Sequence, residues 1–164
     1  MAHSYSHIYG LPCVGLRLFT VYGSYGRPDM APMIFTDSIF NKKPIQIFND
    51  GKMSRDFTYV ADVVEFISRL VNKPPIVKDE SDDYFENFDS NCPYLIFNIG
   101  CGEKIKLLDF IEILEQEIGI KAIKNFTNMQ KGDVVNTFSS TKKIIAYTQY
   151  QPQYSIKRGI KLFI

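Results

Sequence analysis

The sequence predicts an α/β fold built on a parallel sheet that is incomplete within these 164 residues. Apolar runs typical of strands alternate with amphipathic segments typical of helices, which is the pattern of α/β proteins. Three or four strands of any length are expected, and a stable open sheet usually has more. Both ends of the chain lie inside apparent helices. We therefore expect one partial domain over residues 1–164.

The first strand is expected over Pro12–Phe19 and ends in a loop rich in glycine. Val14 to Phe19 is apolar apart from Arg17, so a strand buried on both faces is predicted. Gly23 and Gly26 then interrupt the extended run. Because ligands of open α/β sheets bind just beyond the carboxyl ends of strands, this loop is a candidate wall of a binding site.

The remaining elements follow from hydrophobic spacing and turn residues. Asp29 is expected to cap a helix, and Gly119 is expected to end one. Residues 76–93 are expected to form an acidic surface loop. A helix over 60–71 is expected to bury Val60, Val63, Val64, Ile67, Leu70 and Val71. The other expected elements are helices at 1–9, 30–41, 107–118, 140–147 and 156–164, and strands at 45–48, 56–59, 95–99 and 121–126.

Charge and cysteine content exclude several classes of function. The 19 Lys and Arg side chains nearly balance the 18 Asp and Glu, so no nucleic-acid partner is indicated. No apolar run is long enough to cross a membrane, and no signal peptide leads the chain. The three cysteines form no close-spaced pair, which favours a reducing cytoplasm and no metal. His3 and His7 have metal-ligand spacing, but no third ligand lies near them.

The residues that remain for chemistry are groups suited to anions and bases. No glycine-rich dinucleotide loop and no Gly-x-Ser-x-Gly motif occur. Arg27 and Arg55 have planar forks that suit carboxylates and phosphates, although each could equally form a surface ion pair. Phe48 could stack on a base or belong to the core, and Asp133 could accept from ribose or only shape a turn.

Six segments occur in an order that resembles a known family. They are residues 16–23, 26–31, 44–51, 55–60, 98–100 and 130–134. This order is similar to the C-terminal half of the NAD-dependent sugar-nucleotide epimerases and dehydratases, the extended short-chain dehydrogenase/reductase family. Within it, the resemblance is strongest to the UDP-glucuronate 4-epimerases. Thr20 stands where relatives acting on neutral sugars place Asn, Gln130 stands where some relatives have Arg, and Ser24 replaces a usual proline.

The resemblance implies a fold and a set of site residues. The fold would be the C-terminal part of a Rossmann-like extended short-chain dehydrogenase/reductase, with an incomplete parallel sheet and a small substrate-binding α/β lobe. Thr20 and Arg27 would lie near the sugar carboxylate, and Tyr22 near the nicotinamide of NAD. The other implied substrate contacts are Phe48 on the uracil, the Gln46 main chain to the uracil, Arg55 to the diphosphate and Asp133 to the ribose.

The resemblance also implies what this chain does not carry. The family's glycine-rich NAD loop, catalytic Ser/Thr and Tyr-x-x-x-Lys pair are expected to precede Met1, so no catalytic residue and no metal site are assigned here. The implied reaction is NAD-dependent interconversion of UDP-glucuronate and UDP-galacturonate, with the isolated chain inactive. Expected partners are a UDP-sugar, the N-terminal half as a separate chain, and a second copy, since family enzymes are often homodimers.

Two alternatives stay open at this point. One is another sugar-nucleotide 4-epimerase or dehydratase of the same family. The other is a UDP-sugar-binding module that catalyses nothing.

Overall fold

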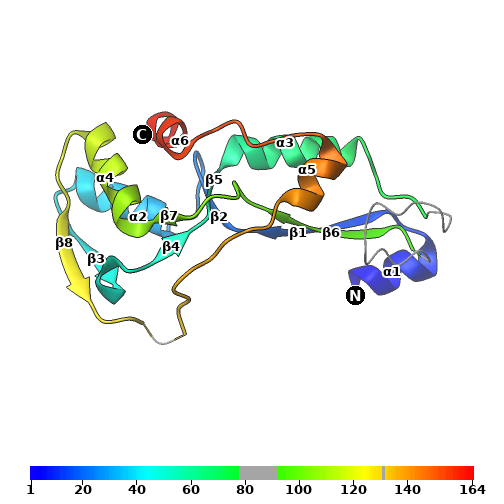
Figure 1. Cartoon of the computed structure of the whole chain (residues 1–164), viewed down its shortest axis with the longest axis horizontal. Coiled ribbons are helices and arrows are strands. Elements are labelled where there is room, and N and C mark those ends of the chain that lie inside the picture. The colour runs from blue at the N-terminus through cyan, green and yellow to red at the C-terminus, as the bar shows by residue number, and fades with distance from the viewer. Residues whose placement is uncertain (78–91, 131) are drawn as a thin grey trace.

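The computed structural model describes residues 1–77, 92–130 and 132–164. The predicted acidic loop at 76–93 falls mostly on residues 78–91, outside the described part. Strands and helices alternate as expected (Figure 1). The helices are α1 Ala2–Tyr9, α2 Ala31–Phe40, α3 Val60–Val71, α4 Leu107–Ile118, α5 Lys142–Thr148 and α6 Ile156–Phe163. The strands are β1 Cys13–Leu18, β2 Thr20–Tyr22, β3 Pro44–Phe48, β4 Ser54–Arg55, β5 Phe57–Tyr59, β6 Tyr94–Ile99, β7 Ile105–Lys106 and β8 Ile123–Thr127.

The described strands pair two by two. Strand β1 pairs with β6, β2 with β5, and β3 with β8, all in parallel, whereas β4 and β7 are antiparallel. Four of these strands, β1, β3, β6 and β8, have five or six residues, which agrees with the expected three or four strands of any length. Strand β5 lies within the strand predicted over 56–59, whereas β2, β4 and β7 have only two or three residues each and were not predicted as separate strands. The α/β class and the parallel pairing agree with the prediction.

One hydrophobic core joins the β1–β6 pair to α3 and α5. Alternate residues of β6, namely Leu95, Phe97 and Ile99, point into it and meet Phe66 of α3 and Ile144 of α5. In Figure 1 these two helices lie on the same side of the strand pair, and α1 lies on the other side.

Strand β1 is only half-buried, which corrects the prediction of a strand buried on both faces. Val14 and Leu16 pack against this core, while Arg17 and Leu18 are exposed, Leu18 by 53%. The reason is that α3 and α5 cover only one face of the strand pair. An apolar run in the sequence predicts burial, but it does not tell whether one or both faces of the strand are covered.

A second core unites the other lobe. Phe57 of β5 and Phe110 of α4 stack with ring centroids 4.2 Å apart, and Tyr22 meets Phe110 edge-to-face. Ile45 and Ile47 of β3 are also fully buried there. The predicted helix over 107–118 is confirmed, including its end at Gly119, which adopts a left-handed conformation.

Helix α3 buries a face that is shifted from the predicted one, and only Val63 and Leu70 of the predicted set are fully buried. Phe66, Val63 and Leu70 are buried, whereas Val64 and Val71 are exposed by 58% and 73%. Asp62, in the first turn of this helix, is fully buried as well. Its carboxylate accepts hydrogen bonds from the Tyr150 hydroxyl and from the amides of residues 153 and 154, which turns this face of the helix inward.

A buried carboxylate at Asp56 connects three segments. It accepts hydrogen bonds from the amides of Cys101 at 2.8 Å, Gly102 at 3.1 Å and Ser139 at 3.1 Å. Gly100 has to be glycine at this point, because a Cβ there would lie 2.2 Å from the Ser139 hydroxyl. The turn after β6 and the segment near 139 are therefore held against the start of β5.

The N-terminus of α2 differs from the expectation. Met30, not Asp29, occupies the N-cap position, and no side chain caps this helix. The Asp29 carboxylate accepts hydrogen bonds from the Arg27 guanidinium instead, because a charged donor two residues away competes with the helix amides.

We predict that Asp56→Asn destabilises the fold by about 3 kcal/mol. The asparagine amide would place N–H donors against amides that now donate to a carboxylate. Urea unfolding followed by circular dichroism measures the loss. Asp50→Asn is the matched control, since Asp50 is exposed at φ 50°, a conformation that Asn adopts readily, and it should change little. Equal stability of the two variants would contradict the assigned role of Asp56.

A second stability prediction concerns Glu115 on α4. Burial alone would raise the pKa of this carboxyl, but hydrogen bonds from Lys124, Lys121 and the Ala122 amide lower the pKa to about 2. A lowered folded-state pKa stabilises the fold above the unfolded pKa near 4.5, and this stabilisation is lost as the pH falls towards 2.

We therefore expect Glu115→Gln to lower the free energy of unfolding by about 2–3 kcal/mol at pH 7 and by almost nothing at pH 2. Unfolding curves over this pH range test the prediction. Glu117→Gln, a change at an exposed side chain, should have the same free energy of unfolding as the parent protein at every pH. A pH-independent difference between the parent protein and Glu115→Gln would show that packing, not charge, is responsible.

Candidate functional site

A cavity of about 660 Å³ lies between α2, β3 and the start of β5. Its apolar wall comes from α2 and the second core, including Ile34, Phe35, Met53, Phe57 and Leu107. Five of the seven predicted site residues line it, although they come from segments up to 113 residues apart. They are Thr20, Gln46, Phe48, Arg55 and Asp133. The fold thus gathers side chains that the sequence presented separately.

Arg55 and Asp133 form an ion pair in this cavity. Arg55 Nη2 donates to Asp133 Oδ1 at 2.8 Å, and both side chains are mostly buried. Arg55 Nη1 donates to the carbonyls of Ser54 and Val135. Arg55 Nε has no hydrogen-bond partner among the described residues, and Asp133 Oδ2 also has none. The pair is therefore fixed in place and keeps one donor and one acceptor for a ligand.

The other end of the cavity is formed by β3. Gln46 and Phe48 share one face of this strand, because side chains alternate along it. The Gln46 side chain accepts a hydrogen bond from Asn125 Nδ2 at 3.0 Å. Phe48 packs partly on the second core and partly lines the cavity, so its ring presents an apolar surface where a flat base could lie. The structure thus places Phe48 partly in the core and partly at the cavity surface.

Arg27 and Tyr22 line a neighbouring cavity of about 420 Å³ rather than the main one. Arg27 is exposed and paired with Asp29. The Tyr22 ring is only 3% exposed, and its hydroxyl donates to the Ile156 carbonyl at 3.4 Å. Burial and nearby anionic groups raise the pKa of this phenol. The structure therefore places Arg27 on a surface loop and Tyr22 in the core.

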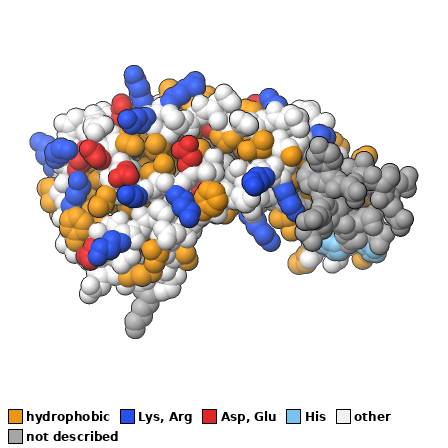
Figure 2. Space-filling view, in the orientation of Figure 1, with side chains coloured by type: hydrophobic (Ala, Val, Ile, Leu, Met, Phe, Trp, Pro, Cys, Tyr) orange, Lys and Arg blue, Asp and Glu red, His pale blue; other side chains and the backbone are white. Residues whose placement is uncertain are grey.

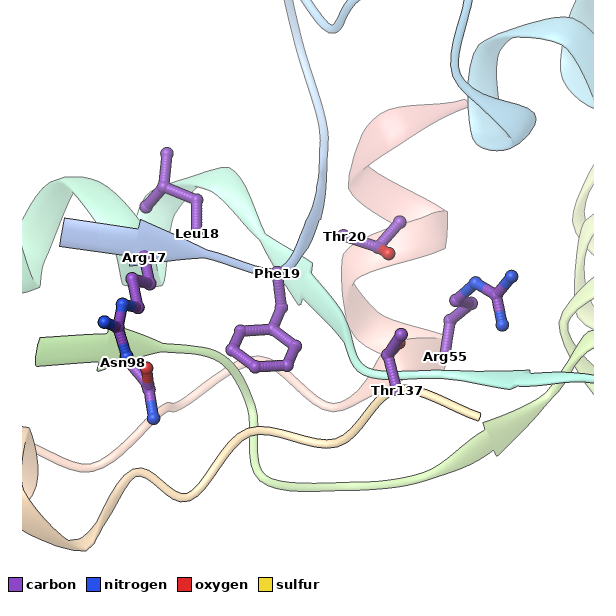
Figure 3. A pocket seen from close by; sticks show the side chains of 7 residues that line it. All are labelled: Arg17, Leu18, Phe19, Thr20, Arg55, Asn98 and Thr137. Carbon is purple, nitrogen blue, oxygen red and sulfur yellow. The ribbon is translucent and has the colours of Figure 1, made fainter. Parts of the chain in front are cut away.

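A third cavity, of about 560 Å³, adjoins the main one through Thr20 and Arg55 (Figure 3). Figure 3 shows Arg17, Phe19 and Asn98 on the same side of the strand ends, with Leu18 on the other side. Arg17, Asn98 and Thr137 were not among the predicted site residues. The polar Arg17 inside an apolar strand was the one available signal for this cavity.

The described residues do not fit the diphosphate of a dinucleotide. Such a group binds the amides of a glycine-rich turn that opens a helix directly. Here Gly23 and Gly26 are separated from α2 by residues 27–30, and Pro32 in the first turn has no N–H. A contact of Tyr22 with nicotinamide would have to come from the part of the residue that lines the neighbouring cavity.

The thiols, the metal-ligating side chains and the helices bear on redox, metal and membrane functions. All three cysteines are free, and burial with the nearby Glu103 and Asp56 charges raises the pKa of the Cys101 thiol to about 11. Within residues 1–77, 92–130 and 132–164, no cluster of three metal-ligating side chains occurs. No helix in that part of the chain has the length and apolar character needed to cross a bilayer. On the face in Figure 2, cationic, anionic and apolar side chains are mixed.

Comparison with known proteins gives a family match and close relatives. Residues 1–84 match the model described as the NAD dependent epimerase/dehydratase family. The chain is 44% identical over 165 residues to "Protein CapI" of Staphylococcus aureus, covering 100% of this chain and 49% of the relative. It is 42% identical over 166 residues to the "Probable UDP-glucuronate 4-epimerase" of Rhizobium meliloti (strain 1021), with the same coverage. The chain spans about half the length of these curated relatives.

Among solved structures, the UDP-glucuronic acid 4-epimerase of Bacillus cereus, in complex with UDP-glucuronic acid and NAD, matches with a TM-score of 0.81. The identity is 31%, and the match covers 99% of this chain and 47% of that one. The predicted architecture, part of a Rossmann-like epimerase fold, is confirmed by this match.

Proposed function

The chain belongs to the NAD-dependent epimerase/dehydratase family, and from this premise we propose that it forms the UDP-sugar-binding part of an enzyme that interconverts UDP-glucuronate and UDP-galacturonate. The observation that carries the proposal is the meeting of Thr20, Gln46, Phe48, Arg55 and Asp133 in one cavity. The relatives named for UDP-glucuronate support the substrate.

The geometry supports a direction for the nucleotide. The uracil lies on Phe48 at the β3 end, where main-chain groups on the edge of β3 away from β8 can pair with it. Arg55 Nε donates to the diphosphate, and Asp133 Oδ2 accepts from a ribose hydroxyl. The fixed ion pair between Arg55 and Asp133 holds both groups at the centre of the site, which lowers the entropic cost of binding.

The sugar carboxylate is assigned to Thr20 and Arg27. Thr20 lies at the junction of the main and third cavities, where a hexose attached to the diphosphate would extend. Arg27 faces the neighbouring cavity, so its guanidinium reaches a sugar carboxylate beside Thr20 only by leaving Asp29. This makes the loop that carries Arg27 the element that adjusts when the substrate binds.

We also propose that these 164 residues bind UDP-sugars without turning them over, because none of the described side chains is placed as a catalytic base. The test joins the chain to the remaining part of the Rhizobium meliloti relative and supplies NAD and UDP-glucuronate. UDP-galacturonate should form. A joined enzyme that epimerises UDP-glucose instead would identify another epimerase of the family, and tight UDP-sugar binding without any turnover would identify a binding module. Free cysteines support a cytoplasmic location.

We predict that Phe48→Ala weakens UDP binding by about 1–3 kcal/mol, the usual contribution of a base stacked on an aromatic ring. Isothermal titration calorimetry with UDP on the 164-residue chain measures the change. Phe40→Ala is the control, since Phe40 is 50% exposed on α2 and lines none of the three cavities. Unchanged UDP affinity in Phe48→Ala would show that the uracil does not stack on Phe48.

Arg27 gives a prediction on substrate choice. Arg27→Ala should lower the affinity for UDP-glucuronate about tenfold and leave that for UDP-glucose unchanged, because only the acidic sugar offers a carboxylate to the guanidinium. Competition titrations with both nucleotides measure the ratio. Lys43→Ala, a change to an exposed cation beyond α2, should leave the ratio as it is. An equal loss for both sugars would assign Arg27 to the diphosphate or to loop stability.

A further inference from the structure

The loop between β2 and α2 carries a cation and an anion that bind each other. Arg27 Nε donates to Asp29 Oδ1 at 3.1 Å and Arg27 Nη2 donates to Asp29 Oδ2, so the guanidinium fork meets both carboxylate oxygens. The hydrogen bond from Arg27 lowers the pKa of the Asp29 carboxyl, which keeps this group charged at neutral pH. The carboxylate of a hexuronate would take the same two N–H groups. Asp29 therefore occupies the donors that the proposed function assigns to the substrate.

This ion pair is more easily replaced than the one between Arg55 and Asp133. The Arg27 and Asp29 side chains are 74% and 62% exposed, whereas those of Arg55 and Asp133 are 19% and 33% exposed. An ion pair that faces water stabilises little, because solvent and salt screen both charges. A ligand carboxylate can therefore displace Asp29 from Arg27, whereas Asp133 stays on Arg55.

Asp29 lies where it can change partners. It lines the main cavity and Arg27 lines the neighbouring one, so the pair stands between the two cavities. Helix α2 begins directly after it, with Met30 at the N-cap position and no side chain that caps the first amides. The N-terminus of a helix carries a partial positive charge that stabilises a nearby anion. A carboxylate that leaves Arg27 therefore keeps a favourable position at the start of α2.

We propose that Asp29 competes with the sugar carboxylate for Arg27 and so sets the affinity of the site for acidic nucleotide sugars. Asp29 holds Arg27 in the free chain, and the substrate carboxylate takes the place of Asp29 as it binds. The exchange is reversed when the nucleotide sugar leaves, because Asp29 binds the guanidinium again. The inference rests on the proposed function through the assignment of Arg27 to the carboxylate.

The size of the competition follows from the exposure of the pair. A ligand that binds only when Arg27 is released from Asp29 is weakened by the fraction of chains in which Arg27 is released. Exposed ion pairs favour the paired form only slightly, so Asp29 should weaken UDP-glucuronate binding by about three- to fivefold. UDP-glucose has no carboxylate to exchange, and its affinity should not depend on this pair.

The test is a double-mutant cycle on the 164-residue chain, with UDP-glucuronate and UDP-glucose each titrated by calorimetry. Asp29→Asn should raise the affinity for UDP-glucuronate about three- to fivefold relative to that for UDP-glucose. In the Arg27→Ala background, the same change at Asp29 should leave the ratio of the two affinities as it is. Asp50→Asn, which removes an exposed carboxylate that lines none of the three cavities, should keep the ratio of the parent chain. Circular dichroism checks that each variant is folded.

Three results overturn the inference. The first is an unchanged affinity ratio in Asp29→Asn. The second is a gain that persists in the Arg27→Ala background, which would show that Asp29 only repels anions in general. The third is a gain in Asp29→Asn that is missing from Asp29→Ala, because the new amide would then be binding the sugar itself.

The outcomes also separate this inference from the proposed function. A lower affinity ratio in Arg27→Ala without a gain in Asp29→Asn keeps Arg27 as the carboxylate ligand and removes the competition by Asp29. An unchanged ratio in Arg27→Ala removes the assignment of Arg27, and the competition with it. If neither nucleotide sugar binds the parent chain, the proposed binding site is wrong and the inference falls with it.

Discussion

The arrangement of the site depends on one buried carboxylate. Asp56 lies between Arg55 and the start of β5, and its carboxylate accepts hydrogen bonds from the amides of the turn after β6 and of Ser139. A buried carboxylate is tolerated only when such donors surround it, so the three segments have to meet there for the chain to fold. The two lobes, each with its own core, are joined at this point.

The same meeting of segments positions the main cavity. Arg55 precedes Asp56 in the chain, and the segment that carries Ser139 also carries Asp133, so anchoring one end of that segment brings Asp133 to Arg55. The Ser54 main chain adds two hydrogen bonds to residues 135 and 137. The buried carboxylate of Asp56 thus aligns the Arg55–Asp133 ion pair of the main cavity, because Arg55 is its chain neighbour and Asp133 lies on the same returning segment as Ser139.

What could be predicted from the sequence divides along physical lines. Helix α4 was predicted with its buried face and its terminal glycine, because its apolar spacing and its stop signal agree. Helix α3 was predicted with only part of its buried face, Val63 and Leu70, since Asp62 is buried by partners about 90 residues away that no local pattern reveals. Of the residues of the main cavity, Arg55, Phe48 and Asp133 were candidates from their residue type, with their roles left open, whereas Thr20 came from the resemblance. Arg17 was treated only as an interruption of a strand.

Three arginines show why residue type alone does not assign a role. Arg55 is mostly buried and already held by Asp133 and two carbonyls, so it can act as a fixed anchor whose order is established before a ligand arrives. Arg27 is exposed and held by a neighbour two residues away, so it suits recognition that requires the loop to rearrange. Arg17 is exposed, lines the third cavity and forms no hydrogen bond or ion pair with the described residues, so water can solvate its charge. Burial and partner, rather than the guanidinium itself, distinguish these three side chains.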